Sequence, residues 1–120
     1  MSAPARRELP ELLRRAAQAA LDKKAADVVA LDLRQAGGFA DHFLLATGQN
    51  QQQLVAIADA VREALLAQGR RPDHVEGYPR QEWILLDYDE LVVHVFTPGL
   101  RSFYDLERLW GGATRHEVRG

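Results

Sequence analysis

The hydrophobic positions in the first half of the chain predict two helices and two strands. Apolar residues recur at helical spacing over residues 9–24, with arginines between them, which predicts an amphipathic helix. The short apolar runs VVALDL (28–33) and HFLLAT (42–47) predict buried strands. A second helix is expected after Asn50, because Asn50 and Gln53 form a capping-box pattern ahead of a long apolar stripe.

The second half of the chain predicts a hairpin and a third helix. Residues 82–96 (EWILLDYDELVVHVF) contain two apolar runs around a polar connection, as in a β-hairpin. Ser102 and Asp105 repeat the [ST]-x-x-[DE] pattern of a helix start, so a short helix through Trp110 is expected. Residues 111–120 are polar and glycine-rich, which predicts a frayed end.

This order of elements predicts a single α/β domain. The strands, together with a short extended piece after Pro72, would form a mixed sheet of four to five strands flanked by helices. No internal repeat is visible in the sequence, and no second domain is needed. We therefore assign residues 1–112 to one domain and residues 113–120 to a flexible C-terminal tail.

Length and composition fit a soluble globular protein. The 120 residues are 47% hydrophobic and 27% charged, which is too hydrophobic for a disordered chain, and the apolar runs are too short for a membrane helix. The absence of Cys excludes disulfide frameworks, thiolate metal sites and cysteine nucleophiles. The N-terminus lacks the apolar region of a signal peptide, so a cytoplasmic location is expected.

Charge is distributed unevenly, although the formal net charge is only −2. Residues 73–90 contain six acidic residues and one Arg or Lys, Arg80, whereas the first 24 residues are rich in Arg and Lys. An acidic patch repels phosphate and attracts basic partners. The small net charge argues against binding nucleic acid by phosphate neutralisation alone. Chance clustering on a solvated surface explains the uneven distribution equally well.

Residues that support catalysis do not form a recognisable set. The four histidines lack the helical spacing of metal ligands, and no G-x-S-x-G nucleophile motif occurs. Thr47 and Gly48 form a strand–glycine–helix corner of the kind that holds phosphate, but helix capping suits a single glycine better. Asp87 and Asp89 fall in a predicted turn. The residues alone therefore give no support for an enzyme, although they do not exclude one, and no cofactor or metal site is expected.

Aromatic residues are concentrated towards the C-terminus. Seven of the nine lie in the last 43 residues, several beside acidic residues. Trp and Tyr are hard to bury completely in a small domain, because the indole N–H and the phenol O–H need polar partners. Trp and Tyr beside acids are typical of protein–protein hot spots. An aromatic core is an equal interpretation for Phe96, Phe103 and Trp110.

An ordered series of short motifs resembles one known family. The motifs are VVALDL (28–33), Asp41 with ATG (46–48), IAD (57–59), EG (76–77), WILLDY (83–88), VVHVF (92–96) and RSFYDLERLW (101–110). No single motif is decisive, but together and in this order they resemble the ribosomal silencing factor family, RsfS, also called Iojap. The resemblance covers about residues 8–112. His42 and Leu91 depart from the usual pattern as tolerated packing changes.

The resemblance implies a small α/β fold related to nucleotidyltransferases but without a working catalytic set. It implies a factor that binds the large ribosomal subunit at ribosomal protein uL-fourteen. There the factor would sterically block the small subunit from joining and repress translation under nutrient limitation. A homodimer is expected when the protein is free, with no membrane partner and no sequence-specific nucleic acid.

We expect the partner-binding neighbourhood to contain seven residues: Trp83, Asp87, Tyr88, His94, Phe96, Arg101 and Tyr104. Glu76 and residues 107–110 are second choices. The acidic segment 73–90 would favour a basic ribosomal protein. Two alternatives stay open: a dimeric adaptor with another protein partner, and a nucleotidyltransferase-like nucleotide binder at the Thr47–Gly48 corner.

Overall fold

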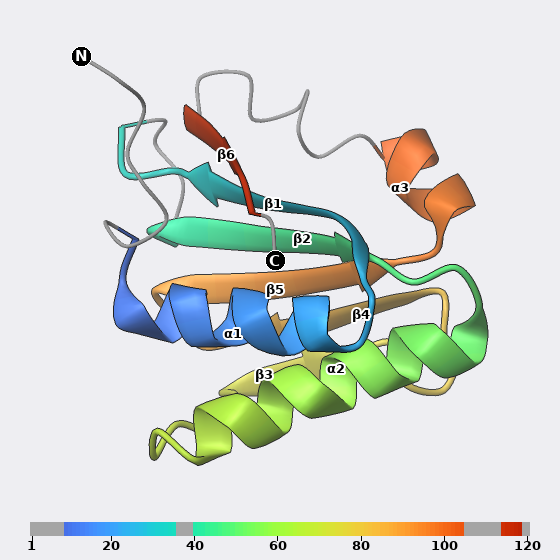
Figure 1. Ribbon diagram of the computed structural model, residues 1–120, viewed down its shortest axis with the longest axis horizontal. Coiled ribbons are helices and arrows are strands. Elements are labelled where there is room, and N and C mark those ends of the chain that lie inside the picture. The colour runs from blue at the N-terminus through green and yellow to red at the C-terminus, as the bar shows by residue number, and fades with distance from the viewer. Residues whose placement is uncertain (1–8, 36–39, 105–113, 119–120) are drawn as a thin grey trace.

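Two helices pack on one face of a six-stranded sheet (Figure 1). The computed structural model describes residues 9–35, 40–104 and 114–118, apart from the side chains of residues 102–104. The helices are α1 (Glu11–Asp22), α2 (Gln51–Leu66) and α3 (Pro98–Tyr104). The strands are β1 (Ala26–Asp32), β2 (His42–Thr47), β3 (His74–Glu76), β4 (Trp83–Asp87), β5 (Leu91–Phe96) and β6 (Thr114–Glu117).

The strands lie in the order β3-β4-β5-β2-β1-β6. Only the central pair, β2 and β5, is parallel among the strands described, and the other neighbours are antiparallel. Helix α2 provides the long connection from β2 to the half of the sheet that contains β3 and β4, as a parallel arrangement requires. The two edge strands are short, with three residues in β3 and four in β6.

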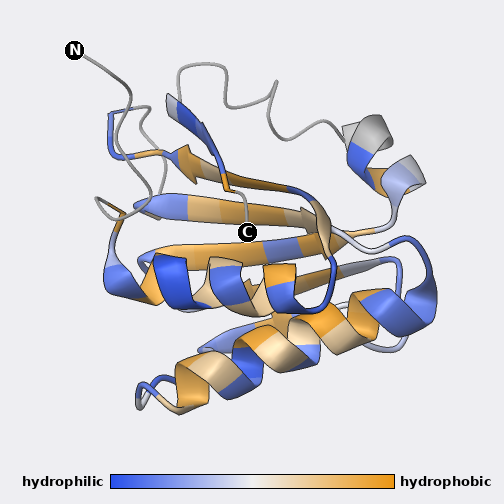
Figure 2. Cartoon of the chain, viewed as in Figure 1, coloured by the Kyte–Doolittle hydropathy of each residue, from blue (hydrophilic) through white to orange (hydrophobic). Residues whose placement is uncertain are grey.

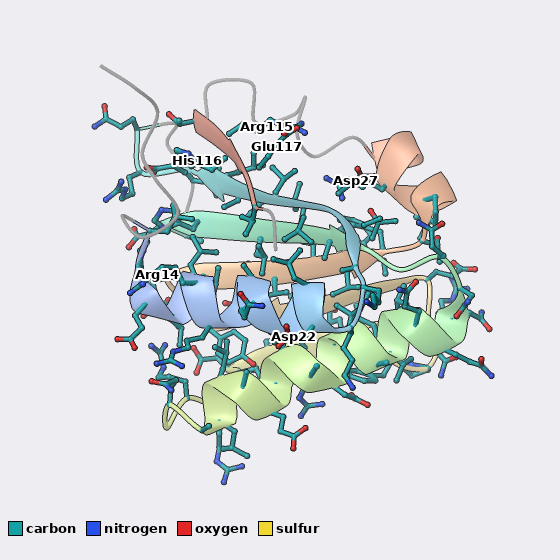
Figure 3. The ribbon with its side chains drawn as sticks, viewed as in Figure 1. Arg14, Asp22, Asp27, Arg115, His116 and Glu117 are labelled. Carbon is teal, nitrogen blue, oxygen red and sulfur yellow. The ribbon has the colours of Figure 1, made fainter. Side chains whose placement is uncertain are left out.

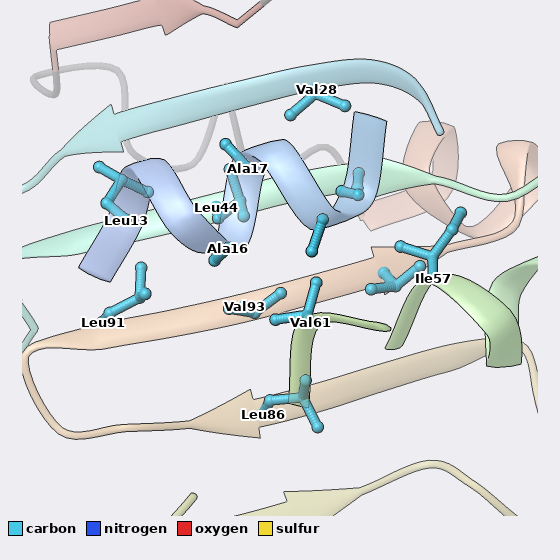
Figure 4. Close-up of a cluster of buried hydrophobic side chains, with 14 of the residues drawn as sticks. Leu13, Ala16, Ala17, Val28, Leu44, Ile57, Val61, Leu86, Leu91 and Val93 are labelled. Atoms are coloured by element: carbon cyan, nitrogen blue, oxygen red, sulfur yellow. The ribbon is translucent and has the colours of Figure 1, made fainter. Parts of the chain in front are cut away.

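The main core lies between the sheet and helices α1 and α2 (Figure 4). The apolar stripe of α1 buries small residues, which lets the helix lie close to the strands. Helix α2 buries its own stripe beside it, namely Leu54, Ile57, Ala58, Val61 and Leu65. Figure 2 shows mostly hydrophobic central strands and hydrophilic patches on the outward sides of both helices. The spacing of apolar residues therefore determines which helix faces turn inward.

The start of α2 confirms the predicted cap. Asn50 Oδ1 accepts a hydrogen bond from the Gln53 backbone N–H at 2.8 Å. Gln53 Oε1 accepts one from the backbone N–H of Gln49, not of Asn50, at 2.7 Å. The Gln53 amide nitrogen also donates to the carbonyl oxygens of Lys23 and Lys24, each at 3.1 Å. The cap thus ties the end of α1 to the beginning of α2.

One expectation about the elements is confirmed in the structure, and three others change. The hairpin is confirmed, because β4 and β5 pair antiparallel through a turn at residues 88–90. The helix expected to begin at Ser102 begins at Pro98, and its expected continuation to Trp110 lies outside the described residues. Residues 114–117 are not a flexible tail, since they pair with β1 as β6. This pairing gives the sheet six strands where four to five were expected.

Candidate functional site

Alternate residues of β4 point to opposite faces of the sheet. Ile84 and Leu86 pack under the helices, whereas Trp83 and Leu85 pack on the face turned away from α1 and α2, which we call the distal face. The distal face has its own cluster of buried apolar residues: Val29, Leu31, Leu33, Ala40, Phe43, Leu45, Val92 and Phe96. Trp83 and Leu85 are only half-buried, so they lie where this cluster meets the surface.

Trp83 stands at the margin of an aromatic group on the distal face. Its ring centroid lies 5.2 Å from that of Phe96 and 5.8 Å from that of His94. The Trp83 indole Nε1–H donates a hydrogen bond to His94 Nδ1 at 3.1 Å. Phe43 meets the imidazole edge-on at 4.6 Å, and Phe96 stacks on it at 5.7 Å. Since the other three are buried, Trp83 is the member of this group that a partner can reach.

Acidic side chains lie beside Trp83 and Leu85. Asp87 shares their face by strand alternation, and β3 pairs His74 with Asp87 and Glu76 with Leu85. His74 and Glu76 are exposed, and the His74 Nε2 and Glu76 Oε1 atoms lie 3.5 Å apart. We call these five residues the β3–β4 surface. It joins half-buried apolar area to a polar, acidic margin, which is the arrangement of many protein-binding surfaces.

Gly77 allows the chain to pass close to Trp83. A Cβ atom at Gly77 would lie 1.8 Å from the Trp83 carbonyl oxygen, and the backbone there has a φ of +97°. Both features favour glycine, which has no Cβ and adopts positive φ readily. Sequence reasoning missed this role, although a glycine directly after a strand signals a close backbone approach.

The structure places the seven predicted contact residues in different settings. Trp83 and Asp87 belong to the β3–β4 surface. His94 and Phe96 lie on the distal face but are buried, with 4% and 1% of their surfaces accessible. Both side chains are therefore nearly inaccessible to a partner in the folded chain, which corrects the expectation that they form part of its contact surface.

Tyr88 lies on the side of the sheet that the helices cover. It is fully buried in the main core, and burial raises the pKa of its hydroxyl to about 12. No described residue forms a hydrogen bond with that hydroxyl. The expectation that Tyr88 contacts a partner is corrected for this reason: the side chain has no accessible surface in the folded chain.

Arg101 connects α3 to the sheet at the end of the distal cluster. Its Nη1 donates to the carbonyl oxygen of Asp27 at 2.6 Å and to Thr47 Oγ1 at 2.8 Å, and Figure 3 shows Asp27 near α3. Thr47 pairs with Phe96 in the parallel ladder, so Arg101 reaches the strand next to the aromatic group. The Tyr104 side chain and residues 107–110 lie outside the described part of the chain.

The Thr47–Gly48 corner has a structural explanation. Thr47 is buried, and its hydroxyl accepts the hydrogen bond from Arg101. A Cβ atom at Gly48 would lie 2.8 Å from backbone atoms of Leu54, so glycine lets the end of β2 approach α2 closely. The hydrogen bond from Arg101 and the close packing on Leu54 therefore account for the residues that the sequence offered as a phosphate corner, while Asn50 caps the helix.

The described residues contain neither a membrane-spanning helix nor a cluster of metal ligands. None of the described helices is long and apolar enough to cross a membrane. Within the same ranges, no group of three or more His, Cys, Asp or Glu side chains converges on a position that would hold a metal ion. Asp32 is paired with Arg34 by two side-chain hydrogen bonds of 2.6 and 3.0 Å, and the hydrogen bonds from Arg34 lower its pKa to about 2.

Comparison with known proteins identifies the family. The family model described as "Ribosomal silencing factor during starvation" matches residues 6–120. The chain belongs to this family. The resemblance drawn from the ordered motifs is thus confirmed, and the protein is a non-enzymatic ribosomal silencing factor.

Relatives and solved structures agree with this assignment. Ribosomal silencing factor RsfS of Halalkalibacterium halodurans is 41% identical over 92% of this chain and 94% of its own length. RsfS of Bacillus subtilis is 39% identical over 85% of this chain and 86% of its own. A crystal structure of a Chromobacterium violaceum protein has a TM-score of 0.81 at 34% identity, covering 92% of each chain. These matches show the same α/β fold in the RsfS family.

Proposed function

We propose that this RsfS family member binds the large ribosomal subunit through the β3–β4 surface and blocks the small subunit from joining. Family membership supports the action on the ribosome. The observation that supports the location is the half-buried pair Trp83 and Leu85, flanked by Asp87 and Glu76 on one face. Silencing by obstruction requires only tight binding, so it needs no catalytic residues.

We infer that the partner on the subunit is the ribosomal protein uL-fourteen. Ribosomal proteins are mostly basic, and the acidic margin of the β3–β4 surface would steer the factor towards such a protein. The same charges disfavour contact with rRNA phosphates. Trp83 would supply the desolvated anchor at the centre of the contact, because Trp is enriched among residues that carry most of the binding energy.

The family resemblance also supports two proposals about the free protein: that it resides in the cytoplasm and that it forms a homodimer. If the dimer used the β3–β4 surface, self-association and ribosome binding would compete. Sizing by light scattering over a range of concentrations, with and without the large subunit, tests this competition. A constant monomer mass at high concentration would contradict the homodimer.

A subunit-joining assay with purified subunits tests the proposed function. Wild-type protein should co-sediment with large subunits and prevent joining without any nucleotide. Trp83→Ala should weaken binding by about 2–4 kcal/mol, roughly 30- to 700-fold, because it removes a central anchor.

Leu66→Ala is the matched control, since Leu66 is 47% exposed on α2, which packs on the opposite face of the sheet from Trp83 and Leu85. It should inhibit joining as well as the wild type does. Unchanged joining in the presence of excess wild-type protein would contradict the proposed function. Equal affinities of Trp83→Ala and wild type would contradict the location.

We further propose that the fold is related to nucleotidyltransferases but has no nucleotide-binding role. The engaged hydroxyl of Thr47 and the close packing of Gly48 on Leu54 support this view. A nucleotide with Mg²⁺ should therefore leave the melting temperature unchanged, because a ligand stabilises a protein only if it binds the native state. A rise in melting temperature at millimolar nucleotide would favour the nucleotide-binding alternative.

A further inference from the structure

His94 is a polar side chain in the middle of an apolar strand. It lies in the run VVHVF of β5, and only 4% of its surface is accessible. Its imidazole is enclosed by Phe43 and Phe96, with centroid distances of 4.6 and 5.7 Å. Burying a polar ring among aromatic and aliphatic neighbours weakens folding unless its nitrogens find hydrogen-bond partners.

Among the described residues, only one nitrogen of His94 has such a partner. The indole Nε1–H of Trp83 can only donate, so the His94 Nδ1 atom that accepts from it carries no proton. Burial lowers the pKa of His94 to about 3, so the imidazole is neutral at physiological pH. The proton of the neutral ring is therefore on Nε2. This atom is buried, and no described residue accepts a hydrogen bond from it.

An unpaired buried N–H is a cost to folding that an apolar residue at position 94 would avoid. What an apolar residue at position 94 could not provide is an acceptor for the hydrogen bond from Trp83. Trp83 is half-buried, and its indole lies at the margin of the distal face. Without this hydrogen bond the orientation of the indole would be fixed less tightly, since Phe96 contacts its ring but does not bind its N–H, and a binding partner would have to order it further on contact.

We propose that His94 is a positioning residue, whose Nδ1 atom holds the Trp83 indole in the orientation that the partner on the large subunit recognises. This inference rests on the proposed function and deepens it. The phenylalanines on either side keep the imidazole in place, and the neutral tautomer keeps Nδ1 available as an acceptor. The buried imidazole lowers the free energy of unfolding, and the same imidazole preorganises Trp83 for binding.

Two substitutions at position 94 separate positioning from packing. His94→Leu keeps apolar bulk but removes the acceptor. His94→Asn places a side-chain oxygen close to the position of Nδ1 and so retains an acceptor for the indole. We expect His94→Leu to raise the melting temperature and yet to weaken large-subunit binding by about fivefold to tenfold, the value of one neutral hydrogen bond. His94→Asn should recover most of that affinity.

The indole N–H signal of Trp83 provides a readout that packing alone would not change. The chain has two Trp residues, so its ¹H–¹⁵N spectrum has two indole signals, and the one missing in Trp83→Phe belongs to Trp83. In His94→Leu this signal should shift upfield and exchange with solvent faster. In His94→Asn it should stay near the wild-type position. A signal that is the same in His94→Leu and wild type would overturn the inference.

A double substitution completes the test. In a Trp83→Phe background, His94→Leu should no longer affect affinity, because there is no indole N–H to hold. An equal loss of affinity in both backgrounds would contradict a role through Trp83. The inference also fails if wild type binds large subunits, Trp83→Ala does not, and His94→Leu binds like wild type. Failure of wild type itself to bind would instead contradict the proposed function.

Discussion

The two faces of the sheet are built from alternate residues of the same strands, yet they differ in chemistry. The face under α1 and α2 carries almost only aliphatic side chains, such as Ile84, Leu86 and Val93. The distal face carries an aromatic group around His94 and ends in the half-buried Trp83. The first arrangement maximises buried apolar area, whereas the second keeps polar atoms beneath a surface that reaches solvent.

We expect the two faces to contribute differently to folding and to partner binding. Aliphatic packing between helices and sheet supplies most of the folding energy, at about 1.5–3 kcal/mol for each large side chain that is fully buried. The distal face and its acidic margin contribute the groups that we propose for partner binding. Substitutions on the two faces should therefore affect stability and affinity to different extents.

The largest effect is expected for Ile57→Ala. Ile57 is fully buried on α2 in the main core, so the substitution leaves a cavity and should cost about 2–5 kcal/mol of unfolding free energy. Chemical denaturation measures this loss. Affinity for the large subunit, measured where the variant is still folded, should stay within about twofold of wild type because Ile57 belongs to the core on the opposite face of the sheet from Trp83. A large loss of affinity in the folded variant would show that the two faces are coupled.

Lowering the pH should lower the free energy of unfolding through the buried His94 on the distal face. An unfolded chain protonates His94 near its ordinary pKa of 6.5, whereas the folded chain resists protonation until about pH 3 because the ring is buried. Between these values the unfolded state binds more protons, so His94 makes stability fall as pH falls, by at most about 1.4 kcal/mol per pH unit.

Denaturation of wild type and His94→Asn from pH 7 to pH 4 measures this contribution. The stability of wild type should decrease more steeply than that of the variant, which lacks the titrating ring. Parallel curves would mean that His94 titrates normally in the folded chain.

A smaller effect is expected at the acidic margin. Glu76→Lys reverses an exposed charge on the β3–β4 surface and should weaken large-subunit binding by about threefold to tenfold at low salt, because exposed charges act mainly through long-range attraction. The difference from wild type should shrink as salt screens the charge. Glu63→Lys makes the same charge change at an exposed residue of α2 and serves as the control. Equal losses in both variants would indicate a general effect of net charge.

Local patterns predicted most of the fold. The cap at Asn50 and the alternation in residues 83–96 placed α2 and the hairpin correctly, because both signals act over a few residues. The strand β6 was missed, since TRHE has little apolar character and is held by pairing with β1, a partner more than 80 residues away in the chain. Such pairing leaves no periodic signal in a polar segment.

The candidate site was predicted only in part. Trp83 and Asp87 lie on one surface, as residues i and i+4 of a strand must. Tyr88 directly follows that strand and turns to the opposite side, where the main core covers it. Aromatic composition favours an interface but does not say which side of a sheet the helices occupy. The bond from Trp83 to His94 depends on the register of β4 and β5, which the sequence leaves open.

The brevity of the outer strands limits how copies of this protein can meet. With three residues in β3 and four in β6, each margin of the sheet offers few unpaired backbone amides and carbonyls to a neighbouring chain. Strand-to-strand growth into fibres is thereby disfavoured at both margins. Association between copies, or with another protein, is then expected to depend on side chains, which evolution can tune one residue at a time.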